Sequence, residues 1–359
     1  MAPLPANEQA ILDAARDVAV PEFQQTLHEL KMLKGAMIRP DGVPQLRIEL
    51  PTPAYPHRKQ LAESVRSAVR EKIGAGDVDI QFTSLVRGKE TGGTIGLRVK
   101  NVVAVGAGKG GVGKSTIAAA LAYGLHSCGA NVGLMDADVY GPSIPHMVGV
   151  HEQPAMKEMQ NESGQVIQRI VPLDAGGVKM ISMGLIVPPD KAVIWRGPLL
   201  HRAITQFLKD TEWGELDYLI VDMPPGTGDV ALTLSQAVGL AGAVVVCTPQ
   251  QVALLDAVKA VNMFQQVNIP VLGMVENMSG EIFGRGGAER KAAELGLPFL
   301  GEIPIEADIR VKGDEGKMAD LFAEGSPSRA ALLHMCERTA MEIAKSVMKG
   351  GGLPTLEIL

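Results

Sequence analysis

Residues 101–116, NVVAVGAGKGGVGKST, constrain the fold of this chain more than any other stretch. The apolar run at their start predicts a buried strand, and the alanine-rich segment from Ile117 onward predicts a helix. Between them, residues 108–115 match the eight-residue pattern of a phosphate-binding loop. In such a loop the glycines let backbone N–H groups point at a polyphosphate, and the helix that follows adds its positive dipole end. The alternative is a glycine-rich turn without a ligand.

The loop pattern assigns chemistry to individual residues. Lys114 is expected to reach the β and γ phosphates, and the Ser115 hydroxyl is expected to hold Mg²⁺. We therefore predict a nucleotide site made by Gly108, Lys109, Gly110, Gly111, Val112, Gly113, Lys114, Ser115 and Thr116.

A second lysine inside the loop, Lys109, is not part of the general pattern. It resembles the early lysine of the deviant P-loop in the ParA, MinD, ArsA and nitrogenase-iron-protein class of ATPases. In that class this lysine crosses a dimer interface to the partner's nucleotide, so the resemblance implies a homodimer with ATP between the subunits. A lysine from a partner can neutralise charge on the transferring phosphoryl group, which would make Lys109 catalytic together with Lys114. A solvated loop lysine is the alternative.

Three carboxylates are predicted to join the loop from other strands. Asp136 follows the apolar segment 131–135, and Asp222 ends the buried run 218–222. Carboxyl ends of strands beside such a loop are where open α/β sheets bind ligands. We expect Asp222 to hold the Mg²⁺ shell, Asp136 to support Mg²⁺ or its waters, and Asp138 to orient the attacking water. Capping of a helix is the alternative role for the aspartates at 136 and 138.

Further segments are predicted to complete the nucleotide site. Asn277 follows the predicted strand 271–275, and its amide offers both a donor and an acceptor, which suits it to reading adenine. A helix-capping asparagine is the alternative. Residues 300–305 and 307–310 are expected to close the base pocket. The loop 226–229 is expected to move when the γ-phosphate leaves.

The order of segments predicts two domains. Residues 1–88 are expected to form a small α+β domain, and residues 89–94 a glycine-rich linker. Residues 95–350 alternate strands with helices, which predicts an α/β fold with a mainly parallel, doubly wound sheet. Within them, residues 151–170 are polar without a period and are expected to be an exposed insertion or loop. The tail, residues 351–359, is expected to be flexible.

Composition excludes several classes of protein. The chain has 34 Lys and Arg against 40 Asp and Glu, with no visible basic stripe, so no nucleic-acid partner is expected. Neither a signal-peptide pattern nor a long apolar run is present, so no membrane partner is expected. Cys128, Cys247 and Cys336 are far apart, which suits a reducing compartment, and we expect a cytoplasmic protein with each thiol packed as a small hydrophobe.

Six blocks of the sequence together resemble the Mrp/ApbC-type iron–sulfur cluster carrier ATPases. They are residues 108–115, DADVYGPS at 136–143, WRGP at 195–198, DMPPGTGD at 222–229, TPQ at 248–250 and ENMS at 276–279. The element order of residues 1–88 resembles the iron–sulfur-assembly domain that often precedes these ATPases. The resemblance implies ATP and Mg²⁺ as cofactors, a homodimer, apoprotein clients that receive clusters, and iron–sulfur assembly proteins as partners.

Two thiol positions of that family are changed in this chain. The N-terminal domain has Tyr55 where the family has cysteine in a Thr-Pro-x-Cys-Pro setting. The family's C-x-x-C pair follows the ENMS block, whereas residues 279–287 run straight through without cysteine. No iron–sulfur ligands are identified, so cluster carriage is implied by the resemblance alone. A cluster-free regulatory or scaffold ATPase and a ParA/MinD-like dimer switch are the alternatives.

Overall fold

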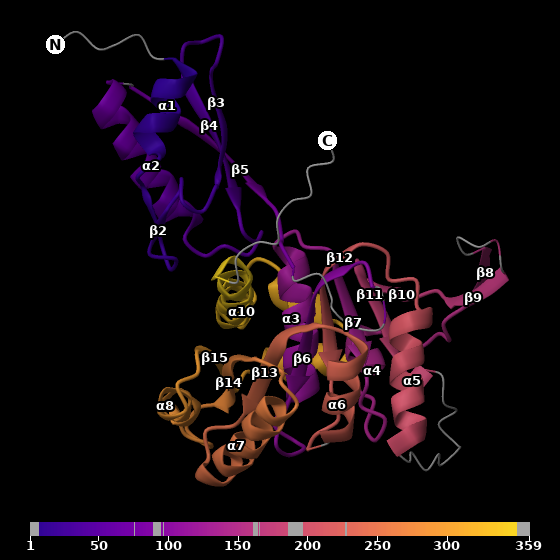
Figure 1. Ribbon diagram of the computed structural model, residues 1–359. Helices are drawn as coiled ribbons and strands as arrows, with labels where there is room; N and C mark the ends of the chain where they lie inside the picture. The colour runs from indigo at the N-terminus through magenta and orange to yellow at the C-terminus, as the bar shows by residue number, and fades with distance from the viewer. Residues whose placement is uncertain are drawn as a thin grey trace. The chain divides into compact units, whose positions relative to one another are not determined.

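An eight-stranded sheet forms the centre of residues 88–343 (Figure 1). Its strands, in spatial order, are β10 (Leu173–Ala175), β11 (Val178–Ser182), β7 (Val132–Asp136), β12 (Leu216–Asp222), β6 (Val99–Gly106), β13 (Leu240–Cys247), β14 (Val271–Ser279) and β15 (Phe299–Pro304). All neighbouring pairs are parallel except β10 and β11, which are antiparallel. The predicted α/β fold with a mainly parallel sheet is confirmed.

The structure is a computed structural model that describes residues 7–74, 76–88, 95, 97–160, 164, 166–185, 197–226 and 228–349. Several predicted features lie outside the described residues. They are the linker 89–94, Trp195 and Arg196 of the WRGP block, Thr227 of the expected switch loop, and the tail 351–359.

Helices cover both faces of the sheet, as its parallel strands require. On one face, a shared apolar core joins the sheet to α5 (Gly197–Asp210), α6 (Gly228–Ala237), α7 (Gln251–Gln266) and α8 (Gly287–Glu294). On the other face, α3 (Lys114–Ser127) packs on β6, β7 and β12. Beside α3 lie α4 (Ile144–Val148), α9 (Ala307–Asp314), the 3-10 helix η2 (Met318–Phe322) and α10 (Arg329–Lys349). A second 3-10 helix, η1 (Met183–Leu185), follows β11.

The strand register brings the predicted site residues to one edge of the sheet. Asp222 at the end of β12 is the Cα partner of Asp136 on β7 and of Val105 on β6. Because these strands are parallel, their carboxyl ends meet at the edge where β6 leads into the phosphate-binding loop.

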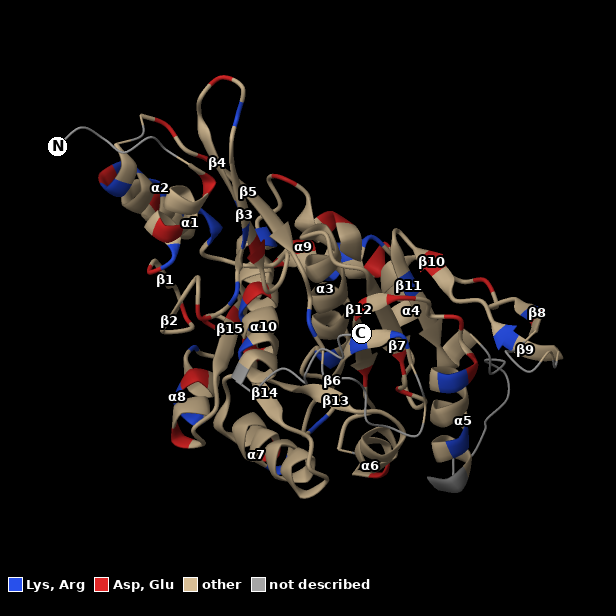
Figure 2. Cartoon of the chain, turned by 45° about the horizontal axis from the view of Figure 1, so that its top comes forward, with Lys and Arg blue, Asp and Glu red and all other residues tan. Residues whose placement is uncertain are grey.

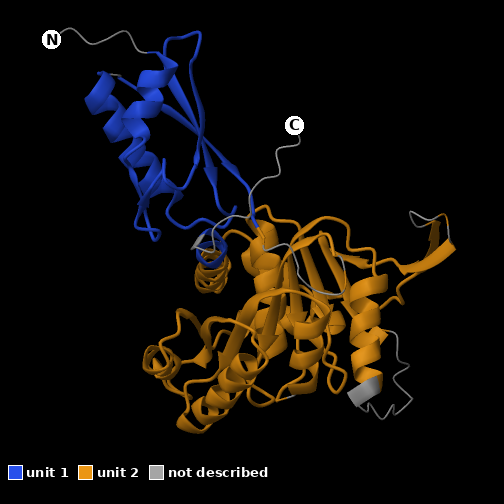
Figure 3. Cartoon of the chain, viewed as in Figure 1, with its two compact units in different colours: residues 1–87, 344–359 blue, residues 88–343 orange. Residues whose placement is uncertain are grey.

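Residues 1–87 and 344–359 form a separate compact unit (Figure 3). Its sheet pairs β3 (Leu33–Ile38) antiparallel with β4 (Pro44–Leu50) and β4 parallel with β5 (Asp79–Ser84). Helices α1 (Glu8–Ala15) and α2 (Arg58–Ile73) pack together, and β1 (Ala19–Val20) pairs with β2 (Gln25–Thr26). This is the arrangement of a small α+β domain.

Residues 151–170 contain an arm of two antiparallel strands, β8 (Met156–Gln160) and β9 (Val166–Ile170) (Figure 1). Most of its described residues are exposed, as predicted, but they form a pair of strands instead of an irregular loop. The sequence did not show the strands because, apart from the buried Ile170, the described residues of β8 and β9 are exposed or half-buried. An alternating apolar pattern arises only when one face of a strand is covered.

Charge is distributed without strong segregation. Figure 2 shows Lys and Arg mixed with Asp and Glu on elements of both units, in keeping with a net charge of −6. Among the described residues, no helix combines the length and the apolar composition that are needed to cross a bilayer.

The core beneath α6 can be tested with two leucines of the same helix. Leu234 is fully buried in the shared core, whereas Leu232 is 44% exposed. Leu234→Ala is expected to lower the free energy of unfolding by about 2–5 kcal/mol, because it leaves a cavity. The matched control Leu232→Ala should change it by less than about 0.5 kcal/mol. Urea unfolding followed by tryptophan fluorescence reports on this core, since Trp213 is buried in it. Equal losses in the two variants would contradict the assigned core.

Candidate functional site

The phosphate-binding loop connects β6 to α3, and backbone geometry fixes its glycines. Gly111 and Gly113 have φ values of 79° and 80°, in the left-handed region that favours glycine. A Cβ on Gly108 would lie 1.9 Å from the Asp256 carbonyl oxygen on α7. The loop therefore needs glycine for its shape and for its close packing on a neighbouring helix.

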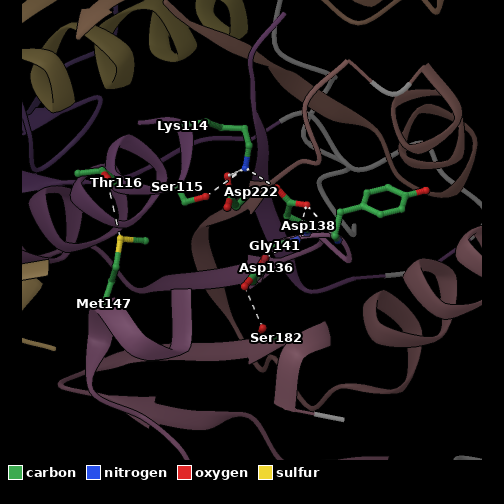
Figure 4. Close-up of polar contacts among 10 residues, drawn as sticks. Lys114, Ser115, Thr116, Asp136, Asp138, Gly141, Met147, Ser182 and Asp222 are labelled. Atoms are coloured by element: carbon green, nitrogen blue, oxygen red, sulfur yellow. Dashed lines mark hydrogen bonds and ion pairs between the residues drawn. The ribbon is translucent and has the colours of Figure 1, made fainter. Parts of the chain in front are cut away.

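Lys114, the first residue of α3, places its ammonium among carboxylates (Figure 4). Its Nζ lies 2.6 Å from Asp222 Oδ1 and 3.4 Å from Asp138 Oδ2. It also donates to the Ser115 hydroxyl at 3.1 Å. Lys114 is 7% exposed and Asp222 is fully buried, so each charge depends on the other for compensation.

Asp136 lies beside Asp222 but is held by a different set of donors. Its Oδ2 accepts from the Ser182 hydroxyl at 2.9 Å, and its Oδ1 accepts from the Asp138 N–H at 3.1 Å. Burial, followed by the charge of Asp222, raises the pKa of Asp136 to about 8. Burial also raises the pKa of Asp222, and Lys114 opposes that rise. Burial and mutual repulsion therefore disfavour the state in which Asp136 and Asp222 are both ionised beside Lys114.

Asp138 is oriented by the turn that follows it. Its Oδ1 accepts from the backbone N–H groups of Tyr140 at 3.2 Å and Gly141 at 3.3 Å. The Oδ2 atom faces Lys114, as Figure 4 shows. These bonds stabilise a turn and cap no helix, because α4 begins only at Ile144.

The donor set fits the predicted Mg²⁺ ion. Asp222 Oδ2 is buried and has no hydrogen-bond partner among the residues that the structure describes. A buried carboxylate oxygen without a partner is costly, and hard oxygen atoms are the ligands that Mg²⁺ prefers. Ser115 supplies a hydroxyl beside the same lysine. Both oxygens of Asp136 already have protein donors, which suits a supporting position.

A cavity of about 500 Å³ lies next to the loop and is lined by both apolar and polar side chains, with the acidic Glu306 and Asp314 among them. Its lining residues include Thr116, Met147, Asn277, Met278, Pro304, Ile305, Ile309 and Arg310. The segments that were expected to close a base pocket thus contribute to this cavity.

Asn277 connects the cavity to the phosphate-binding loop. It lies within β14, and its Nδ2 donates to the Val112 carbonyl oxygen at 2.9 Å. Since a carbonyl oxygen only accepts, the NH₂ group faces the loop, and Oδ1 is the acceptor that remains for a ligand. The helix-capping alternative does not describe this residue.

Lys109 and the expected switch loop complete the surroundings of the phosphate site. Lys109 is half-buried and forms no ion pair with any residue in the described part of the chain. The Gly226 N–H donates to the Ala107 carbonyl oxygen at 3.1 Å, which joins the loop after β12 to the phosphate-binding loop.

The three cysteines lie on separate elements, and Cys247 and Cys336 are buried as expected. Cys247 ends β13, where burial raises the pKa of its thiol to about 12. Cys336 is buried on α10, where burial likewise raises its thiol pKa, and Cys128 is half-buried at the end of α3. Across the described residues, no group of three or more His, Cys, Asp or Glu side chains is arranged to hold a metal ion.

The segment after β14, where the family carries its cysteine pair, is a short loop closed on itself. Gly280 and Gly284 exchange backbone hydrogen bonds of 2.9 and 2.8 Å. The buried Glu276 carboxylate accepts from the Gly286 and Ala288 N–H groups, both at 2.7 Å. Protein groups thus hold this loop in shape through backbone and carboxylate contacts.

Tyr55 takes a structural position in the N-terminal unit. It is 4% exposed, its hydroxyl donates to the Pro21 carbonyl oxygen at 3.3 Å, and burial raises its pKa. A buried phenol fills the place where the family has its thiol.

Two kinds of contact were missed by the sequence analysis. Ser182 reaches Asp136 only because β11 is the sheet neighbour of β7, with Ser182 and Asp136 in register. Met147 and Met278 line the cavity from different elements. Strand order is the signal that would have revealed these contacts, and local sequence patterns do not contain it.

Comparison with known families gives two matches along the chain. Residues 98–340 match the family described as NUBPL iron-transfer P-loop NTPase. Residues 8–82 match a family described as iron-sulfur cluster assembly protein.

Relatives and a solved structure agree with these matches. The iron-sulfur cluster carrier protein of Deinococcus radiodurans is 46% identical over 345 residues, covering 93% of this chain and 95% of that protein. The protein of the same name from Synechocystis is 41% identical over 353 residues, covering 94% and 98%. A nucleotide-binding protein from Archaeoglobus fulgidus, solved with ADP, has a TM-score of 0.52 and 34% identity over 64% of this chain and 93% of its own.

The raised pKa of Asp136 predicts a pH-dependent stability. The folded pKa is about 8 against an ordinary value of 3.8, so the folded state binds the proton more tightly. The stabilising contribution is fully present below the ordinary value and is lost as the pH rises toward 8. Without Mg²⁺, Asp136→Asn should gain stability relative to the wild type progressively across this range.

Urea unfolding at several pH values measures this effect. Glu281→Gln, which changes an exposed carboxylate, is the matched control and should follow the wild type throughout. Parallel pH profiles for the wild type and Asp136→Asn would show that Asp136 does not hold the proton.

Proposed function

This chain belongs to the NUBPL-type iron-transfer P-loop NTPase family, and we propose that it binds and hydrolyses Mg²⁺·ATP as a homodimer in iron–sulfur cluster assembly. The observation that carries the proposal is the buried Lys114–Asp222 pair beside the loop, with one Asp222 oxygen unpartnered among the described residues. Relatives named as cluster carriers over nearly the whole chain supply the biological setting.

The proposed binding step is an exchange of partners. When Lys114 turns from Asp222 to a phosphate, Asp222 needs another cation or a proton, because a fully buried carboxylate is costly to leave charged and unpaired. Asp222 and Ser115 would hold Mg²⁺, which neutralises charge on phosphate oxygens when bound. Nucleotide binding should therefore depend strongly on Mg²⁺.

Asp138 is the proposed positioning group for the attacking water. Its Oδ1 is fixed by two N–H groups, while its Oδ2 faces Lys114. When Lys114 moves to the phosphate, Oδ2 becomes available to accept a hydrogen bond from water. The same lysine shift would thus load the nucleotide and release the residue that orients its attacker.

Asn277 is proposed to favour adenine. The bond from Nδ2 to Val112 fixes the orientation of the amide and leaves Oδ1 as its acceptor, and Asn277 lines the cavity. The exocyclic amino group of adenine can donate to this atom, whereas the corresponding carbonyl of guanine cannot. ATP is accordingly the proposed nucleotide.

Lys109 is proposed to act on the nucleotide of the partner subunit. It is half-buried in the loop and carries a charge that no described residue of its own chain pairs. A cation supplied by the second subunit would stabilise the transferring phosphoryl group and make hydrolysis depend on dimerisation.

Iron–sulfur cargo is proposed to be handled together with partners. The buried thiols of Cys247 and Cys336 have raised pKa values, and thiolates are the form that ligates iron. The loop after β14 contains no cysteine. We therefore assign to this chain the ATP-dependent control of assembly, and to apoprotein clients or assembly proteins the thiolates. A cytoplasmic location suits such partners and the dispersed cysteines.

Two lysine substitutions test the nucleotide site. Lys114→Ala should weaken Mg²⁺·ATP binding at least about a hundredfold, because it removes a buried cation. Lys109→Ala should leave affinity within about threefold, but lower hydrolysis by about a thousandfold and prevent ATP-dependent dimerisation. Calorimetry, phosphate release and light scattering measure the three quantities. Lys157→Ala, on the exposed arm, is the control. Equal loss of binding in both loop variants would overturn the proposed role of Lys109.

Iron and acid-labile sulfide per subunit test the assignment of cargo. After anaerobic reconstitution, the wild type should hold no stoichiometric cluster. A variant with Cys128, Cys247 and Cys336 all changed to alanine should give the same spectrum. A stoichiometric cluster in the wild type that is absent from the variant would show that the chain's own thiols ligate iron.

A further inference from the structure

A bulge in β14 brings two consecutive side chains to one cavity. Successive side chains of a regular strand point to opposite faces, yet Asn277 and Met278 both line the cavity beside the phosphate-binding loop. The pairing of β14 with β15 shifts its register between Asn277 and Ser279. Met278, the residue between them, has φ of 58°.

The left-handed backbone of Met278 is strained, because a side chain at positive φ crowds its own backbone. In residues 88–343, the described non-glycine residues with positive φ are Asn268 and Met278. Asparagine tolerates this conformation through local hydrogen bonds, but methionine has no such group. Met278 is also the member of this pair that lines the cavity. Strain of this kind is concentrated where a ligand site needs it.

If the bulge in β14 only shaped the backbone, there would be no reason for position 278 to be methionine instead of glycine. Glycine would adopt the same backbone without strain and would leave the Asn277 bond to Val112 in place. What glycine lacks is the thioether, which is polarisable and packs favourably against aromatic rings. The Met278 Cε lies 3.4 Å from the position that a Cβ on Gly113 would take. The side chain thus lies between the cavity and the last glycine of the loop.

We propose that Met278 is the residue that positions the nucleobase, its strained bulge holding the thioether against the ring while Asn277 fixes the phosphate-binding loop. This inference rests on the proposed nucleotide-binding function and names the contact that favours a nucleoside triphosphate over a bare triphosphate.

The test compares two ligands on full-length protein. Inorganic triphosphate with Mg²⁺ can contact only the phosphate-binding loop, because it has no base. ATP with Mg²⁺ would contact both the loop and the proposed base position at Met278. Met278→Gly keeps the left-handed backbone and removes the thioether. It should weaken ATP binding about tenfold in calorimetry and leave triphosphate binding within twofold. Asn268→Gly is the matched control, because it relieves the other positive φ without touching the cavity lining, and both affinities should stay at wild-type values.

The outcomes separate this inference from the proposed function. Unchanged ATP affinity in Met278→Gly would overturn the role of the thioether, as would a parallel loss for both ligands, which indicates a collapsed loop. Met278→Leu, which keeps an apolar side chain of similar size, should recover part of the ATP affinity, and failure to exceed Met278→Gly would also count against the contact. If the wild type bound neither ligand, the nucleotide-binding function itself would fail.

Discussion

The buried ion pair between Lys114 and Asp222 is the interaction on which the rest of the site depends. Its two members come from the start of α3 and the end of β12, which the sheet register brings together. Asp136 adds a second carboxylate on the neighbouring strand, and burial raises its pKa. One ammonium thus stabilises a cluster of acids, and a ligand that takes Lys114 leaves Asp222 in need of a cation or a proton. This requirement links nucleotide and metal binding through electrostatics alone.

Strand ends give the site its rigidity, while glycine gives the loop its shape. Contacts with other elements also hold the loop: Asn277 on β14 donates to Val112, and Gly108 packs on α7. Because Asn277 touches the loop and also lines the cavity, the phosphate site and the cavity share a wall. A displacement at one side would be transmitted to the other through a single side chain.

The family framework is retained in a chain whose thiol positions have changed. Where the family carries cysteines, this chain has a buried tyrosine hydrogen-bonded to a backbone carbonyl and a loop closed by backbone and carboxylate contacts. Tyr55 is buried and hydrogen-bonded, and the loop after β14 is held by its own hydrogen bonds, so both segments have a structural role in this chain. On this scaffold the candidate nucleotide site lies at the strand ends beside β6, whereas the segment that carries the family's cysteine pair lies beyond β14.

The sequence by itself determined the phosphate-binding loop, the α/β class and the strand-end positions of Asp136 and Asp222, whereas Asn277, expected after a strand ending at residue 275, lies within β14. It could do so because these are local signals: contiguous glycines, apolar runs and the polar residue that ends each run. Tertiary structure alone decided which strands are neighbours. That order created the Ser182 bond to Asp136 and the commitment of the Asn277 amide to Val112. The register of β14 against β15 likewise placed Met278 in a left-handed bulge. Such contacts join residues far apart in the chain, and the burial that shifts the pKa of Asp136 exists only once the sheet and its covering helices have assembled.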